Sequence, residues 1–146
     1  MSYLLDTCVV SELSKKRPDK SVLAWLSSVA EVDLYVSSLT IAEIRSGIER
    51  FDEMDSRRAR LENWYENIVA SLSRRIISFD HRMAVEWGRI VGASFRTGRV
   101  KPDMDMLIAA TAKSRNMTLV TRNTKDMEGV GVDLLNPFEF QTNERK

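Results

Sequence analysis

The 146-residue sequence is poor in the residues on which many catalytic and metal sites depend, with one cysteine, Cys8, and one histidine, His81. A single cysteine cannot form a disulfide within the chain, and this scarcity favours a reducing compartment such as the cytoplasm. A single histidine excludes a histidine-rich zinc site, and no nucleophile motif near it would complete a Ser-His-Asp or Cys-His arrangement. The glycine-rich phosphate loops GxGxxG and GxxxxGK(S/T) are missing as well.

Long apolar runs and an excess of one charge are also absent. No stretch approaches the ~20 apolar residues of a transmembrane helix, and the first residues lack the pattern of a secretory signal, so we expect a cytoplasmic protein without a membrane anchor. The formal net charge is +1, from 22 Lys and Arg against 21 Asp and Glu. Any nucleic-acid binding must therefore use local basic patches. The candidates, each of which also fits an ordinary solvated surface, are residues 15–17, 57–60 and 74–75.

Short apolar runs are present, and they have the character of buried strands. They lack a clean alternation of polar and apolar residues, which is typical of strands covered on both faces. The length suits one domain with a real core, and 43% of the residues are hydrophobic. The runs cover residues 3–5, 34–36, 76–79 and 118–120, with a weaker candidate at 132–135.

Amphipathic helical patterns separate these runs, most clearly over residues 61–72 and also over 21–28 and 80–97. Strands that alternate with helices predict an α/β fold with a parallel sheet and right-handed crossovers. We therefore expect a single domain over residues 1–138, with a central parallel sheet of about five strands flanked by helices. Residues 139–146 are expected to form a loose tail.

Acidic residues gather at the predicted carboxyl ends of the strands, where open α/β sheets bind their ligands. Asp6 follows the first predicted strand, and Glu43 lies shortly after the second. Asp126 follows the fourth strand, and Asp103 and Asp105 open the helix that leads into it. The sequence thus predicts that acids from several segments meet at one edge of the sheet.

Helix capping offers a structural explanation for most of these acids. Asp6 and Asp103 could cap helices, and Thr40-Ile41-Ala42-Glu43 matches the capping-box pattern. Asp105 is harder to explain, although the helix dipole would favour it in a first turn. Its neighbours three, four and seven positions further on are all isoleucine or alanine. Asp105 is therefore expected on the apolar face of its helix.

A carboxylate on an apolar face needs a positively charged partner, because an unpaired buried charge is very costly. Several carboxylates together also repel one another unless a cation holds them ionised. Sites made only of oxygen ligands suit Mg²⁺ or Mn²⁺. The alternative partner is an arginine such as Arg45 or Arg122, which would make the cluster a structural ion-pair network. From the residues alone, both explanations remain open.

Four motifs, in this order along the chain, resemble the PIN-domain toxins of VapC type, and especially their FitB-like branch. The resemblance extends from Tyr3 to Phe138, including the closing residues 135–138, LNPF. The motifs are LLDT at residues 4–7, SLTIAEI at 38–44, DMLIAATA at 105–112 and LVTRN at 119–123.

This resemblance implies a Mg²⁺- or Mn²⁺-dependent endoribonuclease of a toxin–antitoxin system. By position, Asp6, Glu43 and Asp105 match the three acids of the family, and the resemblance gives them the catalytic and metal-binding roles. Asn123 stands where many relatives have a fourth acid, a departure for which Asp126 or Asp103 could compensate. The resemblance further implies a homodimer, neutralisation by a VapB-like antitoxin, and contact with DNA only through that antitoxin.

In the expected reaction, a metal-activated water hydrolyses an RNA phosphodiester bond. Thr7 and Thr121 would orient a ligand or the water. Arg45, Arg122 and Lys125 would hold the flanking phosphates. The expected target is single-stranded or looped RNA, whose bases are open to contact.

Two other functions fit parts of the pattern. One is a PIN-like binding module that acts with an antitoxin on DNA with little or no catalysis, which Asn123 supports. The other is a phosphate-transfer protein, because receiver domains and HAD-type phosphatases also place Asp at strand ends. The HAD pattern requires an Asp at the position of Cys8, and a receiver requires an acidic pair where Asp6 stands alone. We therefore favour the ribonuclease.

Overall fold

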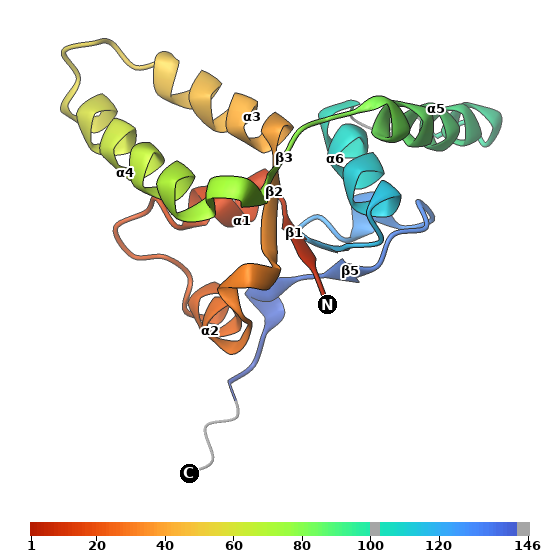
Figure 1. The fold of residues 1–146 in the computed structure, drawn as a ribbon, viewed down its shortest axis with the longest axis horizontal. Coiled ribbons are helices and arrows are strands. Elements are labelled where there is room, and N and C mark those ends of the chain that lie inside the picture. The colour runs from red at the N-terminus through yellow and green to blue at the C-terminus, as the bar shows by residue number, and fades with distance from the viewer. Residues whose placement is uncertain (100–102, 143–146) are drawn as a thin grey trace.

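The computed structural model describes residues 1–99 and 103–142, apart from the side chain of Asp103. Its centre is a five-stranded parallel sheet in the order β3-β2-β1-β4-β5 (Figure 1). The expected parallel sheet is confirmed, and the two edge strands, β3 and β5, are each two residues shorter than expected. The strands are β1 (Tyr3–Leu5), β2 (Leu34–Ser37), β3 (Ile76–Ile77), β4 (Thr118–Val120) and β5 (Leu134–Leu135).

The three predicted helices are found, and α4 begins earlier than expected, at Ser56, because Asp55 accepts a hydrogen bond from the Arg57 amide and caps it. The helices are α1 (Thr7–Glu12), α2 (Lys20–Ser28), α3 (Ser38–Glu49), α4 (Ser56–Leu72), α5 (His81–Arg96) and α6 (Asp103–Ser114). Short 3₁₀ turns are η1 (Glu31–Asp33), η2 (Ser73–Arg75), η3 (Lys125–Met127) and η4 (Pro137–Glu139).

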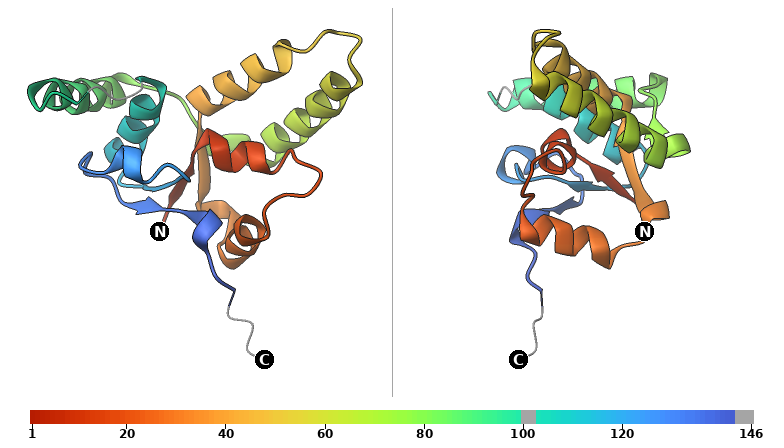
Figure 2. Two further views of the ribbon diagram at one scale, coloured as in Figure 1. Left: turned by 180° about the vertical axis from the view of Figure 1, so that it is seen from behind. Right: turned by 90° about the vertical axis from the view of Figure 1, so that its left-hand side faces the viewer.

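The apolar side chains of the central strands divide between two cores, one on each face of the sheet. Leu4 and Leu119 lie in the core that α5 and α6 cover, whereas Leu5 and Val120 lie in the core beneath helices α1 to α4. This division follows from the two-residue period of a strand. Figure 2 shows the α3–α4 hairpin and the α5–α6 pair on opposite sides of the sheet. Coverage of both faces explains why the strands read as unbroken apolar runs.

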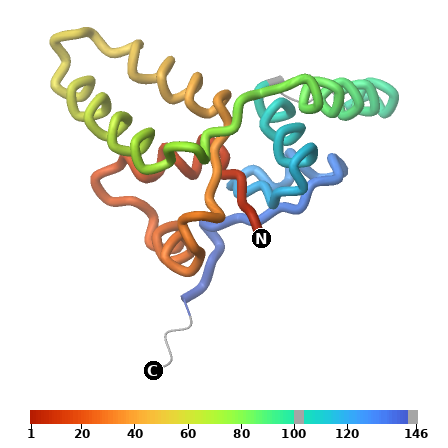
Figure 3. Tube along the Cα trace, in the orientation of Figure 1, coloured from red at the N-terminus to blue at the C-terminus, as the bar shows by residue number. Residues whose placement is uncertain are grey.

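The strand order places a topological switch point beside β1. The chain builds outward from β1 to β2 and β3, then passes through α5 and α6 to β4 on the other side of β1 (Figure 3). The carboxyl ends of β2, β1 and β4 are therefore neighbours at one edge of the sheet. Ligands of open α/β sheets bind in the crevice beyond such a switch point. The acids singled out by the sequence follow these strands or open the helix that leads into β4.

The chain remains packed slightly beyond residue 138, the expected end of the domain. Phe140 is partly buried against the core beneath α1 to α4, just after the short turn η4. Residues 143–146 of the expected tail lie outside the described residues. Among the helices that the structure describes, none is long and apolar enough to cross a membrane.

Candidate active site

Asp6 stands at the centre of this edge, directly after β1, and is only 3% exposed. One carboxylate oxygen accepts a hydrogen bond from the Thr7 amide at 2.8 Å, so the predicted helix cap is formed. The other oxygen accepts a hydrogen bond from the hydroxyl of Thr121, at the end of β4, at 2.7 Å. Asp6 is thus held by the first residue of α1 and by the residue that follows β4, and capping uses only one of its oxygens.

Glu43 is tied to the same edge through Thr7. The Thr7 hydroxyl donates a hydrogen bond to the Glu43 carboxylate at 2.6 Å, which links α1 to α3. The capping box expected at Thr40–Glu43 is wrong, because Ser37 already caps α3 by accepting from the Leu39 amide. Glu43 therefore lies in the second turn of the helix, where its own helix does not need it as a cap.

Asp105, in the first turn of α6, completes the group. Partial burial is the largest cause that raises the pKa of this carboxyl, and the negative charges of Asp6, Glu43 and Asp126 raise the pKa further. These electrostatic effects reach Asp105 from segments that follow β1, β2 and β4. The other acids predicted to meet at the carboxyl edge are therefore near enough to destabilise the charged form of Asp105.

The arginines that could have neutralised this group are engaged elsewhere. Arg45 forms ion pairs with Glu49 and Glu62, on the α3–α4 hairpin. The guanidinium carbon of Arg122 lies 3.6 Å from the centre of the Phe138 ring. Over residues 1–99 and 104–142, no ion pair joins Asp6, Glu43 or Asp105 to a lysine or arginine. Of the two explanations that the sequence left open, the ion-pair network with Arg45 or Arg122 is therefore not formed within these residues.

The acids form an open edge rather than a finished ligand cage. In the described part of the chain, no three Asp, Glu, His or Cys side chains converge closely enough to hold a metal ion as they stand. The donor set nevertheless consists of carboxylates and hydroxyls, which are hard oxygen ligands of the kind that Mg²⁺ and Mn²⁺ prefer. Mg²⁺ also keeps several waters when it binds proteins, so one or two direct carboxylate contacts are enough.

The auxiliary residues named from the sequence lie around this edge in different roles. Thr121 is fully buried and also accepts a hydrogen bond from the Asn123 amide at 3.1 Å. The side chains of Asn123, Lys125 and Asp126 are exposed in the segment after β4. Asp103 begins α6, and its side chain lies outside the described residues.

Two neighbours of the site were not assigned a role there by the sequence reasoning. Thr40 is fully buried, with its hydroxyl oxygen 3.2 Å from that of Thr7, three residues before Glu43 on the same helix. The Cys8 sulfur lies 3.7 Å from an Asp6 oxygen and 3.9 Å from the Thr121 hydroxyl. Burial, followed by the charge of Asp6, raises the pKa of the Cys8 thiol and keeps it protonated. The helical spacing of Thr40 and Glu43 was the available signal for Thr40.

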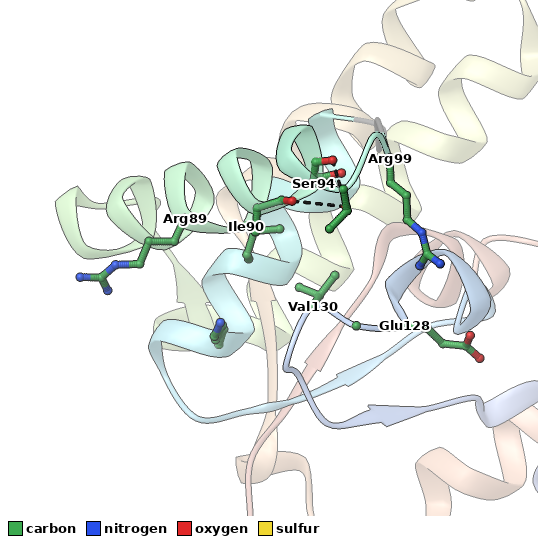
Figure 4. A pocket seen from close by; sticks show the side chains of 10 residues that line it. Arg89, Ile90, Ser94, Arg99, Glu128 and Val130 are labelled. Carbon is green, nitrogen blue, oxygen red and sulfur yellow. Dashed lines mark hydrogen bonds between the residues drawn. The ribbon is translucent and has the colours of Figure 1, made fainter.

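One pocket is lined by none of these acids and lies between α5, α6 and residues 128–130 (Figure 4). Its volume is about 410 Å³, and Arg89, Arg99 and Lys113 are among the side chains that line it. Three cationic side chains make this pocket unsuited to a divalent metal ion. The volume of a pocket therefore does not locate the candidate site, whereas the chemistry of its lining residues does.

The fold and the acids at the carboxyl edge of the sheet together define the class of protein: a parallel α/β domain with carboxylates at its switch point that no basic side chain of the described residues neutralises. Residues 3–131 match the model of the PIN domain. The chain is 34% identical over 137 residues to VapC ribonuclease Y4jK of Sinorhizobium fredii, covering 93% of this chain and 97% of that protein. It is 33% identical over 135 residues to toxin FitB of Neisseria gonorrhoeae, covering 92% and 97%.

Solved structures agree with these sequence matches. The structure of FitAB bound to an IR36 DNA fragment superposes with a TM-score of 0.86 and 32% identity, covering 97% of this chain and 99% of that one. The crystal structure of FitAcB from Neisseria gonorrhoeae gives a TM-score of 0.87 and 32% identity over 94% and 99%. This protein belongs to the PIN-domain family, as its four motifs led us to expect.

Proposed function

We propose that this protein is a divalent-metal-dependent endoribonuclease and the toxin of a toxin–antitoxin pair. The observation that carries the proposal is the group of Asp6, Glu43 and Asp105 at the switch point, with no basic partner within the described chain. The names of the relatives, a VapC ribonuclease and the toxin FitB, support the substrate class and the biological role.

Asp6, Glu43 and Asp105 would hold Mg²⁺ or Mn²⁺, directly or through water. Asp126 is the candidate for the fourth acid that Asn123 does not supply, because its charge acts on Asp105. An ion bound there would lower the pKa of a bound water and offset the negative charge of the scissile phosphate. Its positive charge would also remove the repulsion that raises the pKa of Asp105 in the metal-free protein.

Thr7 and Thr121 act as positioning residues in this proposal. The Thr7 amide and the Thr121 hydroxyl each donate to a different oxygen of Asp6, which fixes the plane of that carboxylate. The Thr7 hydroxyl holds Glu43 in the same way. Groups that orient the ligands of a metal matter for affinity nearly as much as the ligands themselves. The two threonines would thus keep the metal-binding oxygens aimed at one place before an ion arrives.

The residues proposed to contact flanking phosphates differ in their freedom to do so. Lys125 and Arg122 are exposed in the segment after β4. The Arg122 guanidinium stacks on the Phe138 ring through its face, which leaves its N–H groups for a phosphate, so we keep both residues in this role. The Arg45 guanidinium is occupied by Glu49 and Glu62, so its contribution would require those ion pairs to break. The expected substrate remains single-stranded or looped RNA.

We further propose that a VapB-like antitoxin neutralises the protein, that the chain acts as a homodimer, and that it meets DNA only through the antitoxin. The close match to FitAB, whose structure was determined on a DNA fragment, supports this assembly.

The decisive experiment is an RNA-cleavage assay with purified, antitoxin-free protein in the presence and absence of Mg²⁺ or Mn²⁺. We expect cleavage to require the ion and to fall roughly a thousandfold in Asp6→Asn and Asp105→Asn, as the loss of a metal ligand implies. Glu62→Gln is the matched control, because Glu62 is a carboxylate that pairs with arginines and lies outside the acid edge. This variant should retain activity. Equal cleavage by all four proteins would assign the activity to a contaminant and overturn the proposal.

A further inference from the structure

A second, smaller pocket opens directly beside the candidate acids. It has a volume of about 220 Å³ and lies between α1, α3 and α4. Thr7 and Glu43, which hold the acid edge together, also line this pocket, and Phe51 and Trp64 contribute aromatic rings to it. Its lining residues include no lysine or arginine. Whatever occupies this pocket therefore touches the same side chains that hold the site, through an apolar and aromatic surface.

Two basic segments that are distant in the sequence adjoin lining residues of this pocket: residues 15–17 follow Ser14, and residues 57–60 precede Leu61. Arg60 donates a hydrogen bond to the backbone oxygen of Ser14 at 2.8 Å, which joins the two segments where they reach the pocket. Lys16 and Arg17 are exposed, and neither forms an ion pair within the described chain. The nearly neutral chain thus carries exposed positive charge close to an aromatic pocket whose one charged lining residue is Glu43.

This combination matches one kind of ligand. The pocket is smaller than the roughly 300–1,000 Å³ of pockets for drug-sized molecules, so it suits one planar group of the size of a nucleobase. Proteins bind single-stranded nucleic acid by stacking bases on aromatic side chains while basic residues follow the phosphates. The Ser11 hydroxyl, which also lines the pocket, makes no hydrogen bond within the described residues and would be available to the edge of a base. A protein segment would use the apolar surface but would not require the unpaired cations.

We propose that this pocket binds one base of a single-stranded RNA, close to the scissile phosphate, with the base against Trp64 and the neighbouring phosphates on Lys16 and Arg17. The inference rests on the proposed ribonuclease function and adds to it a subsite that selects the nucleotide near the cleaved bond. Because the base would sit beside Glu43, its fit determines how the phosphate reaches the acids.

Gly47 offers a way to fill the pocket without disturbing the fold. It lines the pocket from α3, and a Cβ added there would meet no atom within 4 Å. Replacing a helical glycine also removes a conformational cost, so Gly47→Leu should fold at least as stably as the wild type. Gly88→Leu is the matched control, because Gly88 is a helical glycine of α5 with equally free space and lines neither pocket.

Binding is measured by fluorescence anisotropy with 5′-labelled five-nucleotide RNAs in excess EDTA, so that cleavage does not interfere. We expect Gly47→Leu to weaken binding about tenfold, the size of one lost base–aromatic stack, and Gly88→Leu to leave it unchanged. Removing the base at each RNA position in turn should identify one sensitive position for the wild type. That sensitivity should disappear in Gly47→Leu, because the leucine already excludes the base from the pocket and its removal from the RNA changes nothing further.

The contribution of Lys16 and Arg17 is measured by the salt dependence of RNA binding. Lys16→Ala and Arg17→Ala should each lower the steepness of the salt dependence by about one phosphate contact. Arg74→Ala serves as control, because Arg74 lies beyond the opposite end of α4.

Unchanged RNA affinity in Gly47→Leu would overturn the proposal, and so would a loss confined to binding of an antitoxin, which would make the pocket a protein-docking site. RNA binding that depends on Gly47 but is never followed by metal-dependent cleavage would instead contradict the ribonuclease function and leave the base site standing.

Discussion

Helix α3 carries two glutamates in contrasting surroundings, six residues apart. Glu49 belongs to a network on the α3–α4 hairpin in which Arg45 and Arg58 lie between Glu49 and Glu62. Glu43 belongs to the acid edge, where it accepts a hydrogen bond from the Thr7 hydroxyl and its negative charge acts on the carboxyl of Asp105. One helix therefore carries both a compensated and an uncompensated cluster of carboxylates.

The pKa values of carboxyls in the two clusters are shifted in opposite directions. Hydrogen bonds from Arg45 are the largest cause that lowers the pKa of both Glu49 and Glu62. Burial and the neighbouring acids raise the pKa of Asp105. The hairpin network is complete within the chain and serves the packing of α3 on α4. The acid edge has no basic partner within the described residues. Clusters of like charge of this kind are frequent at functional sites, where a ligand can supply the opposite charge.

Thr121→Val should produce the largest difference between the two clusters. Valine has nearly the shape of threonine but cannot donate to the Asp6 oxygen that Thr121 now holds at 2.7 Å. Metal affinity and RNA cleavage should fall about 10- to 100-fold, as for other groups that orient metal ligands. Metal affinity is measured by Mn²⁺ titration calorimetry, and cleavage by initial rates.

Thr118→Val is the control, because the Thr118 side chain makes no hydrogen bond to another described residue and lies at the other end of β4. Equal effects of the two changes would mean that the strand, rather than the contact with Asp6, was damaged.

The sequence allowed the acid edge to be predicted because Asp6 and Glu43 come after β1 and β2, and Asp105 opens the helix that leads into β4. Once β1, β2 and β4 were recognised, the rule for open sheets brought Asp6, Glu43 and Asp105 to one place. Side-chain partners were harder to predict. The ion pair of Arg45 with Glu62, 17 residues away, depends on how α3 packs on α4, and no local pattern reports that packing.

Capping shows the same limit at shorter range. Thr40 and Glu43 have the spacing of a capping box, but the helix begins three residues earlier because Ser37 provides a competent cap at the end of β2. Two overlapping signals competed, and the geometry of the strand end decided between them. The open arrangement of the acids was equally beyond the sequence, since spacing specifies which residues share an edge but not how closely their oxygens converge.

Neutralising one acid in each cluster should shift stability in opposite directions when no metal is present. Asp105→Asn removes a charge that its neighbours oppose, so the melting temperature in EDTA should rise by about 2–4 °C, the shift expected for roughly 1 kcal/mol in a domain of this size. Glu62→Gln removes a partner of Arg45 and should lower the melting temperature. Differential scanning calorimetry measures both. A decrease in both variants would mean that the acid edge is as well compensated as the hairpin.

The smallest effect concerns the pH dependence of the hairpin, tested with Arg45→Met. Because Arg45 lowers the pKa of Glu62 from its usual 4.5, the folded protein holds this proton less tightly than the unfolded chain. The stabilisation is therefore fully present above the usual pKa and is lost as the pH falls through the lowered one. The melting temperatures of wild type and Arg45→Met should differ most at neutral pH and converge as the pH falls through the lowered pKa of Glu62. They should also approach each other in high salt, because these side chains are partly exposed. A difference that persists unchanged into acid would show that Arg45 contributes through its packing on Tyr65, 5.2 Å from the ring centre, rather than through charge.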